Sequence, residues 1–135
     1  MKFPDVSAVA AALNPFLDAH ADLAGLFAVW DVPAMEAVQV LRSRGQSLPM
    51  TTIDLGNQVA IALARGDIIK GIGAQRAYEQ GVAVAKATIA ALLGRDPPSW
   101  IVLPGLPTTP ENVAQVYRRI WHEAAPPEVL SAQPR

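Results

Sequence analysis

The chain has 135 residues, of which 51% are hydrophobic and 17% charged, and its formal net charge is −1. This composition predicts one folded domain with a substantial core and excludes a disordered chain. The near-neutral charge gives no reason to expect a nucleic-acid partner, and the lack of cysteine excludes disulfides and thiolate chemistry. The longest apolar run, residues 82–93, contains Lys86 and is too short for a membrane-spanning helix, so we expect no membrane insertion.

Apolar residues recur at helical spacing in some segments and form short continuous runs in others. The first helix is expected over residues 6–21, with either a kink at Pro15 or a restart after Asn14, and a strand covered on both faces over residues 25–30. The elements expected after them are helix 31–44, strand 48–55, helix 58–65, strand 68–74, helix 77–93, strand 100–103 and a helix from residue 109 to about 123. This alternation predicts an α/β fold with a parallel sheet and flanking helices. We expect one lobe over residues 1–125 and a polar, proline-containing tail over residues 126–135.

Polar and aromatic residues follow the expected strands at their carboxyl ends. Trp30 and Asp31 follow the first strand, Asp54 ends the second, and Gln75 and Arg76 follow the third. The carboxyl ends of parallel strands share one edge of the sheet, where open α/β sheets bind ligands. An aromatic ring can stack on a sugar ring, while carboxylates and amides hydrogen-bond to hydroxyl groups. The set therefore predicts a binding site for a small polyhydroxylated molecule.

Each of these residues also has a simpler interpretation. Asp31 can be only the N-cap of the next helix, Trp30 can close the core, and Arg76 can be a solvated residue of a first helical turn. Asp54 is harder to explain structurally, because Asn57 is available as the cap of the following helix. A carboxylate pair can act in glycoside hydrolysis, but we expect no enzyme, since no nucleophile motif or cofactor loop is present. We expect no cofactor and no metal.

Three motifs, "GLFAVWD", "TTIDLG" and "KGIGAQ", in this order and at these intervals, resemble the C-terminal portion of type I periplasmic sugar-binding proteins of the ribose-binding kind. The resemblance implies that Trp30, Asp54 and Gln75 face the ligand and that Asp31 caps the next helix. Trp30 stands where an amide is usual in that family, which favours stacking. The helix 77–93 would pack on the family's other lobe, and the segment near residue 100 would lead back through the hinge.

Members of that family close two lobes on a sugar, and the resemblance covers only the last half of such a protein. We therefore expect an exposed sheet edge, an exposed face of helix 77–93, and a homodimer or an exchange of elements between copies. The implied function is sugar or polyol binding for an ABC-type importer, with a permease and an ATPase as partners. The alternatives are the sensing domain of a LacI-like transcription regulator and a truncated fragment that only self-associates.

The resemblance implies a periplasmic location. Lys2, the apolar residues 6–13 and the small residues around His20 are arranged as in a signal peptide, but Asp5 and Asp18 argue against one. We expect no export signal, and hence a cytoplasmic location if Met1 is the true start.

Overall fold

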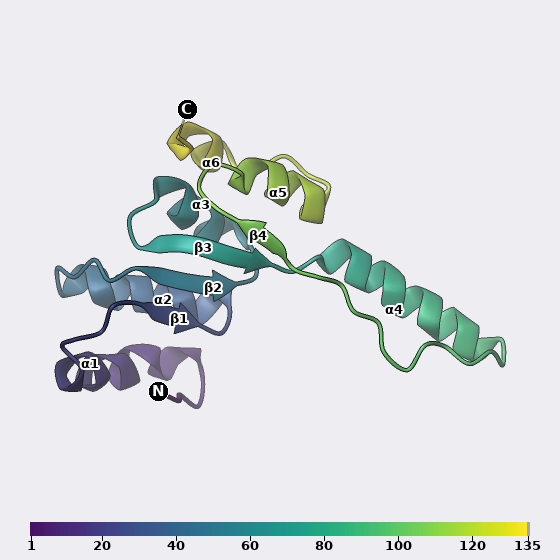
Figure 1. Cartoon of the computed structure of the whole chain (residues 1–135), viewed down its shortest axis with the longest axis horizontal. Helices are drawn as coiled ribbons and strands as arrows, with labels where there is room; N and C mark the ends of the chain where they lie inside the picture. Colours follow the sequence, from purple (N-terminus) through teal and green to yellow (C-terminus); the bar gives the residue numbers. More distant parts are fainter. Residues whose placement is uncertain (135) are drawn as a thin grey trace.

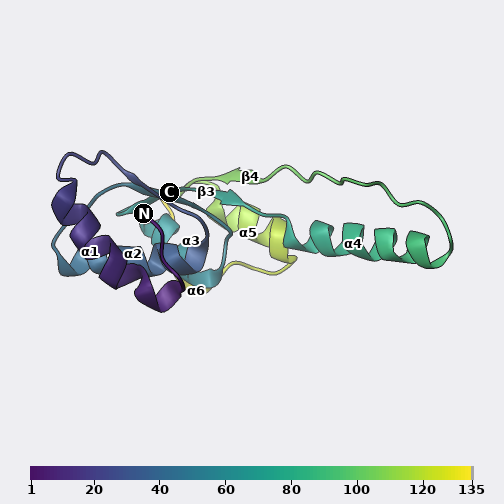
Figure 2. The ribbon, with the colours of Figure 1, turned by 90° about the horizontal axis from the view of Figure 1, so that it is seen from below.

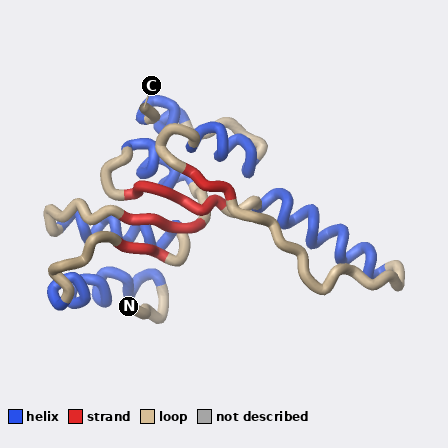
Figure 3. The backbone as a smooth tube through the Cα atoms, viewed as in Figure 1, coloured by secondary structure: helices blue, strands red, loops and turns tan. Residues whose placement is uncertain are grey.

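The computed structural model describes residues 1–134 and is an α/β fold (Figures 1 and 3). Its elements in chain order are η1 Val6–Ala8, α1 Val9–Ala19, β1 Leu26–Ala28, α2 Asp31–Ser43, β2 Met50–Ile53, α3 Asn57–Arg65, β3 Ile69–Ala74, α4 Ala77–Leu92, β4 Leu106–Thr108, α5 Val113–Trp121 and α6 Pro127–Ala132. The predicted α/β class is therefore confirmed. Within these residues, no helix combines the length and apolar character needed to cross a lipid bilayer.

The four strands form one sheet in the order β1-β2-β3-β4. β1, β2 and β3 are parallel, whereas β4 is antiparallel to β3, with Ala74 opposite Leu106. The prediction of a wholly parallel sheet is therefore wrong at its last strand. The predicted strand at residues 100–103 is wrong too, since β4 forms a few residues later. The physical reason is that the chain leaves the end of β3, runs out along α4 and returns to that same end, so the next strand must run in the opposite direction.

One face of the sheet is covered by helices and the other is open (Figure 2). Met50, Thr52 and Ile72 point to the covered face and are buried. Phe27 points to the open face and is 61% exposed, and Thr51 beside it is also exposed. The expectation that the first strand is covered on both faces is therefore wrong. Its apolar run continues beyond the three strand residues, which is why it resembled a fully buried strand.

Residues 77–105 project from the rest of the molecule as an arm made of α4 and an extended returning segment (Figure 1). No residue of α4 is buried, and Trp100 on the returning segment is 81% exposed. The expected exposure of helix 77–93 is therefore confirmed. The helix follows the sequence pattern closely and ends before Gly94, which has a positive φ of 70°.

The sequence predicted a polar tail over residues 126–135, but its described part, residues 126–134, includes a helix that packs on the lobe. Pro126 and Pro127 open the short helix α6, and Val129 on that helix is completely buried in the main core. Proline at the first position of a helix costs no hydrogen bond, so the pair favours a helix start there. α6 lies against α3 and α5, which extends the lobe beyond residue 125.

The burial of Val129 is testable against its exposed neighbour Leu130. Val129→Ala should lower the free energy of unfolding by about 2 kcal/mol, because it removes buried methyl groups and leaves a cavity. Leu130 is 57% exposed, so Leu130→Ala should change it by less than about 0.5 kcal/mol. Urea unfolding of both variants measures the difference, and equal effects would show that α6 does not belong to the folded core.

Candidate functional site

The carboxyl ends of β1, β2 and β3 lie level at one edge of the sheet. Ala28 pairs with Thr52, and Ile53 pairs with Gly73, so the residues that follow each strand emerge side by side. Trp30, Asp54 and Gln75 are therefore placed on one rim by the backbone. We call this set, together with Asp31 and Arg76, the rim residues.

Asp54 has an unusual backbone conformation. Its φ is +69°, in the left-handed region, and its amide donates to the carbonyl of Gly73 at 3.3 Å. Aspartate tolerates this region better than most residues, but the conformation still costs free energy. The consequence is a sharp turn at the end of β2 that leads directly into α3.

The loop formed by residues 54–57 is held by its neighbours at successive positions. The indole Nε1 of Trp121 donates to the carbonyl of Leu55 at 2.8 Å. The next amide, that of Gly56, donates to Asp31 Oδ2 at 3.0 Å. The hydroxyl of Tyr117 donates to Asn57 Oδ1. With the Asp54 amide bonded to β3, the loop is fixed from β3, α2 and α5 at once.

The two capping predictions for this region are wrong. Asp31 is the first residue of α2 and makes no side-chain cap bond, because its carboxylate binds Gly56 across the rim instead; Trp30 occupies the N-cap position. Asn57 does not cap α3 either, and Gly56 occupies that N-cap. A Cβ on Gly56 would lie 2.5 Å from Asp31 Oδ2, so the close approach of backbone and carboxylate explains the glycine.

The Asp54 carboxylate is partly buried, and the described part of the chain gives it no partner. Within residues 1–134 it accepts no hydrogen bond and forms no ion pair. Burial, and then the negative charge of Asp31, raise the pKa of Asp54 above its ordinary value of 3.8. The rim therefore presents a fixed carboxylate whose hydrogen-bonding capacity is not used by the protein itself.

Trp30 contributes a partly exposed aromatic ring to the rim. Its side chain is 38% exposed, and its ring centroid lies 6.1 Å from that of Phe3, with the two planes tilted by 50°. This edge contact steadies the indole without burying it. The ring can therefore still offer apolar surface to a bound molecule.

The side chains of Gln75 and Arg76 both bond to residues in the first turn of α4, at the base of the arm. Gln75 Oε1 accepts a hydrogen bond from Gln80 at 3.0 Å, which leaves the amide nitrogen of Gln75 free within the described residues. Arg76 pairs with Glu79 at 3.0 Å. Arg76 thus pairs with neither Asp31 nor Asp54 within the described residues, and its ion pair instead stabilises the first turn of α4.

Tyr117 and Trp121 were not predicted as part of this region. They lie one turn apart on α5, where an amphipathic pattern indicated only a core-facing helix. Their polar atoms bond to the loop after β2, which lies 60 residues or more earlier in the chain. The spacing of apolar residues along the helix does not reveal such a contact. The described residues also contain no cluster of His, Asp and Glu that could hold a metal ion.

The fold is shared with several solved solute-binding proteins of ABC transporters. One from Agrobacterium vitis, with bound α-D-tagatopyranose, is 24% identical over 86% of this chain, with a TM-score of 0.76. A second from the same organism, with bound allitol, is 20% identical over 87% of this chain, with a TM-score of 0.71. The periplasmic binding protein of the arabinose transporter from Shewanella sp. ANA-3 is 20% identical over 96%, with a TM-score of 0.70.

The chain spans only 40–43% of the length of these three proteins. The comparison therefore confirms the predicted resemblance at the level of fold. The resemblance covers only part of each of these solute-binding proteins. No protein-family model matches the chain, and no curated protein matches it in sequence.

The left-handed conformation at residue 54 predicts a difference between two variants that both lack the carboxylate. Asp54→Gly should be more stable than Asp54→Ala by about 1 kcal/mol, because an alanine Cβ clashes with the backbone in this region and glycine has none. Thermal or urea unfolding measures the difference. An alanine variant at least as stable as the glycine variant would be inconsistent with the positive φ.

The raised pKa of Asp54 predicts a pH-dependent effect on stability. Because the folded state holds the Asp54 proton more tightly than the unfolded state, this group makes the free energy of unfolding fall as the pH rises from 3.8 through the raised pKa. Asp54→Asn removes that loss. The variant should therefore gain stability over the wild type as the pH rises through and above 3.8, and a gain independent of pH would contradict the burial of this charge.

Proposed function

We propose that the chain binds a small sugar or polyol at its rim, without covalent chemistry, as part of the solute-binding component of an ABC-type sugar importer. The observation that carries this proposal is the Asp54 carboxylate. It is partly buried, free of protein partners within residues 1–134, and mounted on a loop held by β3, α2 and α5.

A fixed loop favours binding because it reduces the entropy lost when a ligand is captured. The bonds from Trp121 and Asp31 hold the backbone on both sides of the loop, at Leu55 and Gly56. Asp54 therefore needs no rearrangement before it accepts hydrogen bonds from a ligand. Two adjacent hydroxyl groups of a sugar match the two oxygens of one carboxylate.

The neighbouring rim residues supply the other contacts that a sugar requires. The exposed part of the Trp30 ring offers an apolar surface for the C–H face of a pyranose. The free amide nitrogen of Gln75 offers a donor on the next strand end. Since Arg76 is paired with Glu79, the rim carries no free cation, which favours a neutral ligand over an acidic one.

The names of the structural neighbours support this class of ligand. They bind allitol, α-D-tagatopyranose and L-arabinofuranose, and one is described as the periplasmic component of an arabinose ABC transporter. The proposal extends these properties to the present chain, with a permease and an ATPase as partners and a periplasmic location. Because the chain spans about two fifths of those proteins, its rim offers part of a binding shell, and we expect affinities in the millimolar range.

A thermal-shift screen against pentoses, hexoses and inositols at millimolar concentration tests the proposal. A ligand at ten times its dissociation constant adds about 1.4 kcal/mol to the free energy of unfolding, which corresponds to roughly 4 °C for a domain of this size. Isothermal titration then confirms direct binding of any sugar that raises the midpoint. Asp54→Asn should abolish the shift while preserving the shape of the residue.

The matched control is Asp96→Asn, which removes one carboxylate from the turn at the far end of the arm. This variant should respond to the sugar as the wild type does. No shift with any sugar, or a shift that persists in Asp54→Asn, would contradict binding at the rim.

A further inference from the structure

The outer edge of β1 has backbone groups without partners. β1 borders the sheet and, within residues 1–134, pairs with β2 alone. The amide of Leu26 donates to the carbonyl of Pro49 on the β2 side at 2.9 Å. Successive residues of a parallel strand point their N–H and C=O groups to opposite sides, so those of Phe27 point away from β2. The described part of the chain places no hydrogen-bond partner there.

A cavity of about 270 Å³ lies along this edge. Residues 25–29 line one side of it, with side chains from both faces of β1, such as Leu26 and Val29. Residues 1–23 line the other side, where α1 lies beside β1 (Figure 1), and they include Phe3 and Leu13. Because both faces of β1 contribute, the cavity surrounds the edge of the strand and does not lie over one face. We call this cavity the edge groove.

The edge groove offers two kinds of chemistry. All of its lining residues are apolar or glycine, so its hydrogen-bonding groups belong to the backbone. A small apolar molecule would take water from the N–H and C=O of Phe27 without replacing the lost hydrogen bonds. A charged molecule would lose its own hydration without gaining an ion pair. An extended peptide meets both demands, since its backbone pairs with the strand edge and its apolar side chains fill the cavity.

We propose that the edge groove binds an extended segment of another polypeptide, which joins the sheet as a fifth strand beside β1. β1 has three residues, so the segment pairs over about three to five residues. The lining of the groove requires that this stretch be uncharged and that its inward side chains be apolar.

A lone extended segment fits this edge better than a second folded copy of the chain does. In a second copy, β1 has its own α1 beside it, so two edges that meet would bring both α1 helices and both N-terminal segments to one place (Figure 1). A single strand brings no such bulk. It can enter the groove between β1 and residues 1–23.

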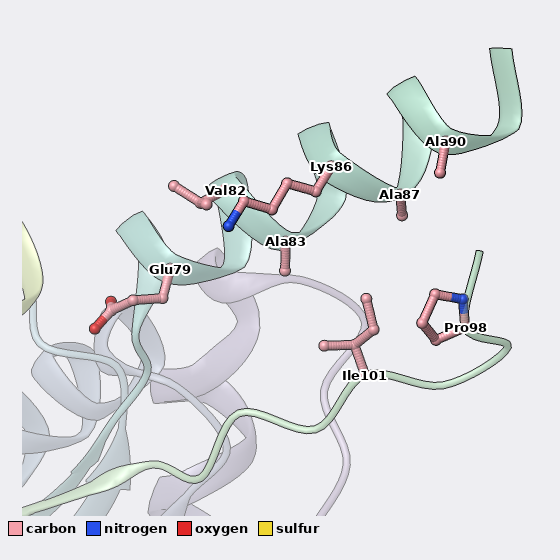
Figure 4. Close-up of a pocket in the computed structure, with 8 residues that line it drawn as sticks. All are labelled: Glu79, Val82, Ala83, Lys86, Ala87, Ala90, Pro98 and Ile101. Carbon is pink, nitrogen blue, oxygen red and sulfur yellow. The ribbon is translucent and has the colours of Figure 1, made fainter. Parts of the chain in front are cut away.

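The groove along the arm does not offer the same combination. It has a volume of about 400 Å³, and Ala83 and Ala87 face Ile101 across it (Figure 4). Its wall on the helix side is the middle of α4, where backbone N–H and C=O groups are bonded within the helix. A strand can therefore add to β1 but not to α4.

The edge groove is separate from the rim. Among the described residues, those that line the groove include none of the rim residues, and strand addition needs no sugar. The proposal therefore stands or falls apart from the proposed function.

Amide hydrogen exchange, followed by NMR, tests strand addition with a capped peptide in which valine and threonine alternate between two terminal lysines. At ten times the dissociation constant of the peptide, exchange at the Phe27 amide should slow about tenfold, because this amide is open only in the free chain. The amide of Val102 on the returning segment, which also has no partner within residues 1–134, is the control and should keep its rate. The same peptide with aspartate as its central residue should bind at least about tenfold more weakly.

Two exposed valines form a matched pair for the groove. Val29 lines it and is 50% exposed, whereas Val84 on α4 is 65% exposed. Val29→Asp should raise the dissociation constant of the peptide at least about tenfold, because it brings a charge into the apolar contact. Val84→Asp should change this constant by less than about threefold.

A second pair of variants isolates the backbone contact. Phe27→Pro removes the outward N–H and leaves the hydrogen bonds to β2 in place, since proline is tolerated on an edge strand. It should bind the peptide about fivefold more weakly than Phe27→Ala, which loses the same ring but keeps the N–H. Circular dichroism checks the fold of both, and the valine pair decides the question if the proline variant does not fold.

Three outcomes would overturn the proposal. Exchange at Phe27 that stays fast up to the solubility limit of the peptide would show that no strand adds there. Peptide binding that Val29→Asp leaves unchanged would place the contact elsewhere. A chain that dimerises without peptide and protects the Phe27 amide in the dimer has a second copy at this edge.

Discussion

The hydrogen bond from the Gly56 amide to the Asp31 carboxylate is the contact on which the rim depends. At 3.0 Å it joins the start of α2 to the loop that follows β2, across two neighbouring strand ends. Without it, the turn at Asp54 would be anchored only by β3 and α5. A Cβ at position 56 would lie 2.5 Å from this carboxylate, so any residue other than glycine would force the Asp31 side chain to move. One local contact thus explains an aspartate, a glycine and the geometry of the loop between them.

Several features of Asp54 lower the stability of the folded state. The residue has a positive φ of 69°, its carboxylate is partly buried, and the charge of Asp31 lies near enough to raise its pKa. Strain of this kind persists only where the surrounding structure overdetermines it, as Trp121 and Tyr117 do here. A core-closing role would be served better by an uncharged side chain. These costs are one reason why we propose that the Asp54 carboxylate binds a ligand.

The sequence predicted the aligned ends of β1, β2 and β3 well and the chain reversal poorly, for physical reasons. Parallel strands with short connections bring their ends to one edge whatever the details, so Trp30, Asp54 and Gln75 could be placed together from spacing alone. The direction of β4 could not, because it depends on where the chain returns after α4, and no local pattern records that. The ion pair of Arg76 with Glu79 was not predicted either, although Glu79 lies only one turn ahead on the same helix. The burial of Val129 escaped notice because a short, proline-flanked segment resembles a tail.

The open face of the sheet and the exposed surface of α4 differ in how much apolar area they present. The open face of the sheet is lined largely by Thr51, Gly71 and Gly73, with Phe27 as its large apolar side chain. Glycine and threonine add little hydrophobic free energy when covered, because they offer little apolar area. Helix α4, in contrast, presents Tyr78, Ile89 and Leu92 at 54%, 56% and 81% exposure. A contact that buries apolar surface therefore gains more free energy at the arm than at the open face of the sheet.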